Sequence, residues 1–390
     1  TQEEMRNVPE IAKHAGRTAT LASLLPEKEG VNLSEYVREV LERSPFLFAG
    51  KDWDALCSKH GLSPDLMRQA MRQDLARDWG LEALLVETLE RALETYSLRA
   101  VIVDEEHSPQ AGALGAWARQ RQIPVLHIHQ GLGLAGNDPA NQTMLSDVIA
   151  VAGPRDIEAW QDAGLAAGRM IQTGNPAWVK YTELAAMKAD CRAGLARLIG
   201  WGSGPLIVFG TGYAPIQSPS TDPEVLAAAA RAFFRCARES GKVHPASIWA
   251  VLLQAEDPEG LETALKAWAA EEGVPSGRLH FFRNDAELFL AAAELVVSVD
   301  STLIVQALLA GTPALNVLTD SGWRVGPAFA ADTGVQEVAP EDMREHVLKA
   351  LERPAMDARA LESARNAYQP ANGDPIKNVV DWIASMLAPA

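Results

Sequence analysis

The stretch best suited to holding an anion is 294–318, where an apolar strand-like run ends in SVDST (298–302) and a helical pattern begins. Backbone N–H groups and hydroxyls at a helix N-terminus favour bound negative charge. One helical turn later comes a polar side chain on the adjoining surface, Gln306. The pattern predicts a phosphate site, and plain N-capping by the Ser-Thr pair is the alternative. The predicted residues of this site are Asp300, Ser301, Thr302 and Gln306.

A second small-residue turn follows an earlier apolar run, in the segment FGTGY (209–213). Thr211 and Gly212 there would let a ligand approach backbone N–H groups closely. A simple tight turn is the alternative. The turn lacks a following Gly-Lys-Ser/Thr, so it is not a P-loop.

Acids and imidazoles follow two strand-like runs in the first half of the chain. Asp104, Glu105 and His107 come directly after RAVIV (99–103), which predicts a general base or a nucleophile at a strand end. A solvated loop before a helix start at 108–109 is the alternative.

The run IPVLHIHQG (123–131) carries the other imidazoles. Alternation places His127 and His129 on one face, but no third metal ligand is evident, so we predict no metal. His127 is expected in the core. His129, Gln130 and Gly131 are expected to contact a sugar or an acceptor. The glycine spacing from Gly131 also fits a dinucleotide motif, but loop residues rather than a helix follow, which disfavours NAD or FAD.

Composition excludes several kinds of partner. The chain has 390 residues, 47% of them hydrophobic, and a formal net charge of −16 without a long basic run. This disfavours nucleic acid and anionic lipid. The three cysteines are far apart, as in a reducing compartment, and the longest apolar stretch is interrupted by Glu294 and Asp300. We therefore expect a soluble, cytoplasmic protein, able to act at the inner face of the membrane, with no transmembrane segment.

The elements that must position these residues form two series of alternating strands and helices. The predicted strand runs of the first series are 99–106, 123–131, 146–153 and 169–176, and those of the second are 205–212, 247–254, 278–284, 294–300 and 312–318. Such alternation predicts α/β domains with parallel sheets. The Gly/Trp-rich segment 200–205 reads as a joint between them. Helical periodicity dominates before residue 98, with an expected break near Gly80 and a weak strand signal at 45–50. The predicted divisions are a mainly helical region 1–97, a first α/β domain 98–179, a second α/β domain 180–372 and a closing helix 373–390.

Four of these segments, taken in order, resemble a known family. They are DEEHSPQAGALGAWARQRQIPVLHIHQG (104–131), SDVIAVAG (146–153) with the later TGNP (173–176), DST (300–302) with the helix and AGTPALNVL (310–318) that follow it, and DPIKNVVDWIASML (374–387). The chain resembles GT-B glycosyltransferases over about residues 98–388, closest to the bacterial capsule, teichoic-acid and Kdo-type transferases, which are related to nucleotide-sugar 2-epimerases. The resemblance implies two tandem Rossmann-like domains that face a cleft.

The resemblance also implies an activity and assigns roles. Such enzymes move a sugar from a nucleotide-activated donor to a glycan or other cell-envelope acceptor, in polysaccharide biosynthesis, without a metal or cofactor. Ser301 and Thr302 would hold the donor phosphate, Thr211 and Gly212 would face the donor, and Gln306 would lie where the family has a ribose-binding Glu. Arg283 and Asn284 would lie near the nucleobase. The base or nucleophile would come from the first domain, from Asp104, Glu105, His107 or His129.

Two departures from known signatures bear on the alternative functions. The epimerase signature Asp-Ser-Gly-Gly is replaced here by Asp300-Ser301-Thr302-Leu303, which disfavours the alternative of a nucleotide-sugar 2-epimerase or hydrolase. Gln306 stands in place of the usual Glu, which motivates a second alternative, a non-catalytic binding module derived from such an enzyme. The donor sugar, the nucleotide base, the acceptor and the oligomeric state are left open.

Overall fold

The structure is a computed structural model, and it divides into two compact units. One unit is Ala150–Val379, and the other contains 51–128, 144–149 and 380–387. The residues that the structure describes are 38, 51–104, 108–128, 144–162, 164–201, 204–211, 223–254, 257–283, 286–318, 329, 333–352, 358–369 and 374–387. Among them, no helix is both long and apolar enough to cross a bilayer.

Two helices precede the first sheet, α4 (Lys51–Lys59) and α5 (Pro64–Thr95). The long helix α5 starts at the N-cap Ser63 and buries Leu85 and Leu89 against α6 (Pro109–Gln120). The predicted break near Gly80 is wrong, because α5 continues through this buried glycine; a single helical glycine costs only about 1 kcal/mol. The predicted strand at 45–50 lies outside the described residues.

The first sheet has four strands in the order β1-β2-β3-β4. Strands β1 and β2 are parallel, with Val101 opposite Val125. Asp147, just before β3, accepts a hydrogen bond from the Val125 N–H at 2.8 Å. The bounds confirm the predicted strand runs: β1 (Val101–Val103), β2 (Val125–Ile128), β3 (Val148–Val151) and β4 (Met170–Gln172).

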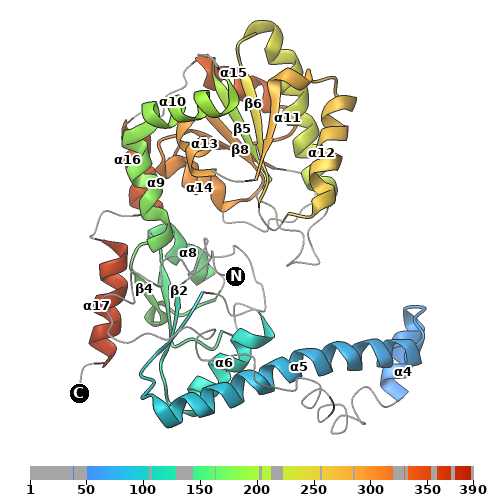
Figure 1. The fold of residues 1–390 in the computed structure, drawn as a ribbon, viewed down its shortest axis with the longest axis vertical. Helices are drawn as coiled ribbons and strands as arrows, with labels where there is room; N and C mark the ends of the chain where they lie inside the picture. The colour runs from blue at the N-terminus through green and yellow to red at the C-terminus, as the bar shows by residue number, and fades with distance from the viewer. Residues whose placement is uncertain are drawn as a thin grey trace. The chain divides into compact units, whose positions relative to one another are not determined.

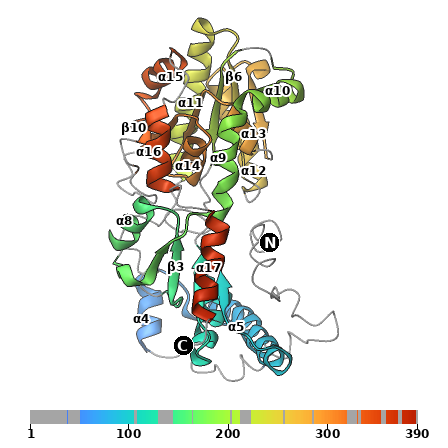
Figure 2. The same ribbon diagram turned by 90° about the vertical axis from the view of Figure 1, so that its left-hand side faces the viewer.

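The segment after β4 is held by the C-terminal part of the chain. The Gln369 amide brackets Asn175, accepting from its N–H at 2.7 Å and donating to its carbonyl at 2.9 Å. Asn378 donates to the Thr173 carbonyl at 3.0 Å. Gly153 at the start of α8 has no room for a Cβ beside the Ala367 carbonyl. The helices concerned are α8 (Pro154–Asp162), α16 (Ala358–Tyr368) and α17 (Pro375–Leu387), and Figure 2 shows α17 in red.

A run of short helices then leads to the second sheet. Its last member, α10, is capped at its C-terminus by Gly200, whose φ of 66° suits glycine. At the predicted joint, Gly204 lies so close to the Ala246 carbonyl that a Cβ would overlap it. The run comprises η2 (Pro176–Trp178), α9 (Val179–Leu184), η3 (Ala185–Met187) and α10 (Lys188–Ile199).

The second sheet has six parallel strands in the order β10-β9-β8-β5-β6-β7. Its order reverses between β5 and β8, the arrangement of a doubly wound Rossmann-like domain. The sequence predicted strands β5 to β9 but not β10. The strands are β5 (Leu206–Gly210), β6 (Ile248–Leu252), β7 (Leu279–Phe282), β8 (Leu295–Ser298), β9 (Ala314–Val317) and β10 (Val335–Val338).

Helices cover both faces of this sheet (Figure 1). Alternate residues of β5 face opposite ways, so Leu206 and Val208 join one core and Ile207 and Phe209 join the other. The first core is shared with α10, α13 (Ala286–Ala292), α14 (Thr302–Leu309) and α16. The second is shared with α11 (Pro223–Val243), α12 (Glu259–Glu271) and α15 (Met343–Glu352).

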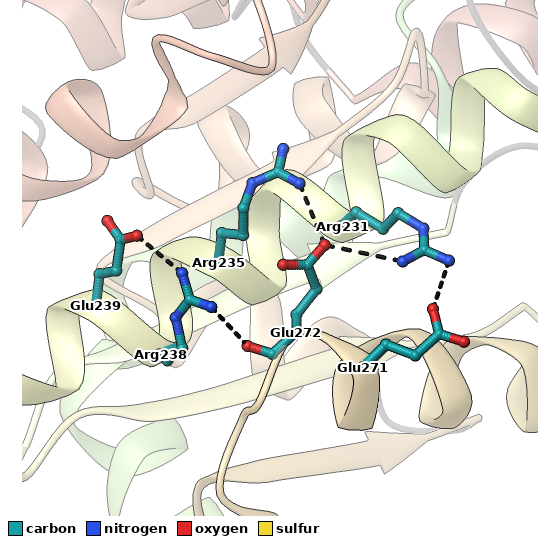
Figure 3. A network of polar contacts seen from close by, with 6 residues as sticks. All are labelled: Arg231, Arg235, Arg238, Glu239, Glu271 and Glu272. Carbon is teal, nitrogen blue, oxygen red and sulfur yellow. Dashed lines mark hydrogen bonds and ion pairs between the residues drawn. The ribbon is translucent and has the colours of Figure 1, made fainter.

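Ion pairs on the surface tie α11 to the end of α12 (Figure 3). Arg231 pairs with Glu271 at 2.7 Å, and Arg235 pairs with Glu272 at 3.2 Å. Arg238 donates to the Glu272 carbonyl at 3.1 Å, where α12 ends. These contacts hold the C-terminal end of α12 against α11 on the surface of the protein.

The amino end of the sheet holds a buried acid. Glu294 precedes β8, accepts a hydrogen bond from the Leu206 N–H at 2.6 Å and pairs with Arg192 of α10. Arg192 also lies over the Trp201 ring, 4.7 Å from its centroid. Lys188 donates to the Ala293 carbonyl at 2.7 Å, and burial together with the charge of Arg192 lowers the pKa of Lys188 to about 8.

Candidate functional site

The carboxyl ends of β5 and β8 meet where the strand order of the second sheet reverses. In open parallel sheets this crevice is where ligands bind. The Ser298 hydroxyl donates to the Gly210 carbonyl at 2.8 Å and links the two strand ends. A Cβ on Gly210 would lie 2.5 Å from Leu303 Cδ1, so the glycine lets the first turn of α14 pack against the end of β5.

Helix α14 starts at this edge, as the sequence predicted. Ser301 is its N-cap, buried, and accepts a hydrogen bond from the Leu303 N–H at 3.2 Å. Ser301 therefore caps the helix, and its role toward a phosphate stays a prediction. Thr302 and Gln306 are half-buried and share one side of the helix, whereas the positions between them are fully or nearly fully buried. These two are the side chains that α14 presents outside its core.

The residue before the cap, Asp300, has an unusual backbone. Its φ is +40°, which few residues other than glycine adopt. Its N–H donates to Asn316 Oδ1 at 2.8 Å, and its own Oδ1 accepts from Asn316 Nδ2 at 2.8 Å. Sequence reasoning missed Asn316. Its signal was a lone amide in the apolar run ALNVL, because a buried amide needs hydrogen-bond partners.

The Thr211 side chain, predicted to face the donor, is fully buried and directed to the end of β6. Its Oγ1 lies 3.0 Å from the Leu252 carbonyl and 2.5 Å from Asp257 Oδ2. Asp257 Oδ2 also accepts from the Gln254 N–H at 2.8 Å. Asp257 is a second residue that the sequence did not indicate, since its partner is 46 positions away.

Arg283, at the end of β7, organises the same loop. Its guanidinium donates to the carbonyls of Gln254 and Asp257, at 2.9 and 3.1 Å. Together with the Thr211–Asp257 contact, these bonds tie the carboxyl ends of β5, β6 and β7 to one another. Arg283 thus braces this edge of the sheet, and its position beside a nucleobase stays a prediction.

The residues predicted from the first sheet are only partly described. Asp104 follows β1 and is half-buried, and His127 is buried in β2 as expected for a core residue. Within the part of the chain that the structure describes, no group of three or more His, Cys, Asp or Glu side chains could hold a metal ion. The remaining predicted site residues lie outside the described ranges: Glu105, His107, His129, Gln130, Gly131, Gly212 and Asn284.

Comparisons with known proteins give structural likenesses alone. The sequence matches no family model and no curated protein. A UDP co-structure of MnaA from S. aureus has a TM-score of 0.56 at 14% identity, covering 99% of this chain and 94% of that one. HepE from Anabaena in complex with UDP-glucose has a TM-score of 0.52 at 13% identity, covering 93% and 97%. A UDP-GlcNAc 2-epimerase from Methanocaldococcus jannaschii has a TM-score of 0.52 at 14% identity, covering 78% and 82%.

These likenesses define the class of fold. The chain is an α/β protein with two parallel sheets and a GT-B-like fold, as the sequence predicted. The likeness to the first two structures extends over nearly the whole chain on both sides.

Proposed function

We propose that the protein is a nucleotide-sugar-dependent enzyme that holds the diphosphate of its substrate at the N-terminus of α14. The observation that carries this proposal is the position of that helix start. It lies at the carboxyl end of β8, beside β5, where the strand order reverses, in a fold shared with structures that contain UDP or UDP-glucose. The half-buried Thr302 and Gln306 are the side chains best placed to contact the bound nucleotide.

Glycosyl transfer is the reaction we propose. The bond between the anomeric carbon and the phosphate oxygen breaks, and the acceptor hydroxyl oxygen bonds to that carbon. The leaving nucleoside diphosphate gains negative charge, which the positive end of α14 stabilises without a metal. The hydroxyl proton goes to a general base in the first domain. The predicted candidates for this base are Asp104, Glu105, His107 and His129.

The residues at the helix start favour transfer over epimerisation. The chain has Ser301-Thr302 where the 2-epimerase signature has Ser-Gly. A 2-epimerase remains the second candidate, because several structures with this fold are named as UDP-GlcNAc 2-epimerases. Incubation with UDP-GlcNAc and no acceptor separates the two. Proton NMR would show a new 2-epimer for an epimerase, and no epimer for a transferase.

A pair of matched variants tests the binding site. Thr302→Glu places a negative charge in the first turn of α14, where it favours the helix but repels a phosphate. Thr302→Gln has nearly the same size without the charge. We expect UDP to raise the melting temperature of the wild type and of Thr302→Gln, by mass action on the folded state, and not that of Thr302→Glu. An equal shift in both variants would contradict the proposed site. No shift in the wild type with UDP, CMP, CDP or GDP would favour the non-catalytic binding module.

A further inference from the structure

The start of α14 is held by a contact that reaches across the sheet edge. Asn316, near the end of β9, is fully buried and makes two hydrogen bonds to Asp300, one to its backbone N–H and one to its carboxylate, both at 2.8 Å. Sixteen positions separate the two residues, and Asp300 immediately precedes the N-cap Ser301. The first turn of the helix is therefore attached to a neighbouring strand through one amide side chain.

This contact offsets a backbone cost. Positive φ costs most residues with a Cβ about 1–2 kcal/mol, and Asp adopts it when its short polar side chain forms a local hydrogen bond. The conformation at Asp300 persists because the surrounding contacts over-determine it. The amide suits this task because it accepts with its oxygen and donates with its nitrogen at the same time. Loss of Asn316 would remove both of these hydrogen bonds from Asp300, which would favour a return toward an ordinary φ and would turn the adjoining N–H groups of α14.

We propose that Asn316 is a positioning residue for the nucleotide diphosphate. It fixes Asp300 in its left-handed conformation and so aims the first N–H groups of α14 at the crevice between β5 and β8. This inference rests on the proposed function, because it assumes that a diphosphate binds there. It predicts a defect specific to the phosphates, since Asn316 is buried and would not contact the nucleoside itself.

The first test compares UDP with uridine. In Asn316→Ala we expect UDP affinity, measured by calorimetry, to fall about tenfold. This is the effect of weakening one hydrogen bond from an N–H group of α14 to a charged phosphate. Uridine affinity, measured by NMR titration, should stay within twofold of the wild type. The matched control is Thr312→Val, which removes a buried hydroxyl at the opposite end of β9, 3.4 Å from the Ala293 carbonyl. It should lower thermal stability but leave the ratio of UDP to uridine affinity unchanged.

The second test uses Asn316→Asp and keeps the inference falsifiable if the alanine variant does not fold. A protonated acid can replace the amide, donating to Asp300 and accepting from its N–H, whereas two ionised carboxylates at this distance repel each other. Relative to the wild type at each pH, UDP affinity should be nearly normal at pH 5.5 and about tenfold weaker at pH 8.5, with uridine unaffected.

The outcomes separate this inference from the proposed function. If the wild type binds UDP and both Asn316 variants keep the wild-type ratio of UDP to uridine affinity, the positioning role is wrong and the proposed function stands. If uridine and UDP affinities fall together, the role of Asn316 is merely structural, and the inference is likewise overturned. If the wild type binds neither UDP nor another nucleoside diphosphate, both the inference and the proposed function fail.

Discussion

Replacement of Glu294 tests how the central strand β5 is anchored. Its carboxylate accepts from the Leu206 N–H at 2.6 Å and pairs with Arg192, and the Glu294 side chain is only 8% exposed. Removing one partner of a buried ion pair costs about 3–5 kcal/mol, because the other charge is left without compensation. Arg192 is 28% exposed, so water relieves part of that cost. We therefore expect Glu294→Ala to lower the free energy of unfolding by about 3 kcal/mol.

Glu294→Gln separates the two contributions. Its amide oxygen can still accept from Leu206, so only the ionic part is lost, and we expect a decrease of about 1–2 kcal/mol. The assay is urea unfolding followed by tryptophan fluorescence, since Trp201 lies against Arg192. The control is Glu345→Gln, which breaks the exposed Lys349 pair on α15 and should change little. If Glu294→Ala lost less than about 1 kcal/mol, or no more than Glu345→Gln, the anchoring role would be refuted.

Two further predictions concern the same region. Burial and the charge of Arg192 lower the pKa of Lys188 from 10.5 to about 8. Between pH 8 and 10.5 the unfolded chain therefore binds more protons than the folded one, so the free energy of unfolding rises with pH. Calorimetry should show that the wild type gains about 2 kcal/mol relative to Lys188→Met between pH 7 and 10, and a constant difference would show that Lys188 keeps an ordinary pKa. Gly204→Ala would force a Cβ into the Ala246 carbonyl and should lower the free energy of unfolding by about 2–3 kcal/mol. The control Gly194→Ala, in open space within α10, should raise it by about 0.5–1 kcal/mol. Equal melting temperatures for the two variants would contradict the close approach at Gly204.

Local sequence was sufficient for β1 to β9 and for the helix that carries the proposed site. Runs such as LIVFG and LVVS are apolar throughout because both faces of a parallel strand are covered, and they become β5 and β8. The start of α14 is likewise a local property, since the Ser301 hydroxyl caps the N–H of Leu303, only two residues along the chain. Two misses also have local causes. Gly80 does not break α5, because one helical glycine costs only about 1 kcal/mol, and β10 alternates apolar with polar residues, VQEV, at the sheet edge.

Amino-acid sequence alone therefore determined which segments form strands and helices, that two parallel sheets follow each other, and which residues follow the strand ends. Only the tertiary structure decided what those residues contact. Thr211 reaches Asp257 rather than open crevice, Asn316 holds Asp300, and Gln369 brackets Asn175 from 194 positions away. The physical reason is that a buried polar group takes whichever partner the strand order brings within about 3 Å, and strand order is set by long-range packing that no local pattern encodes.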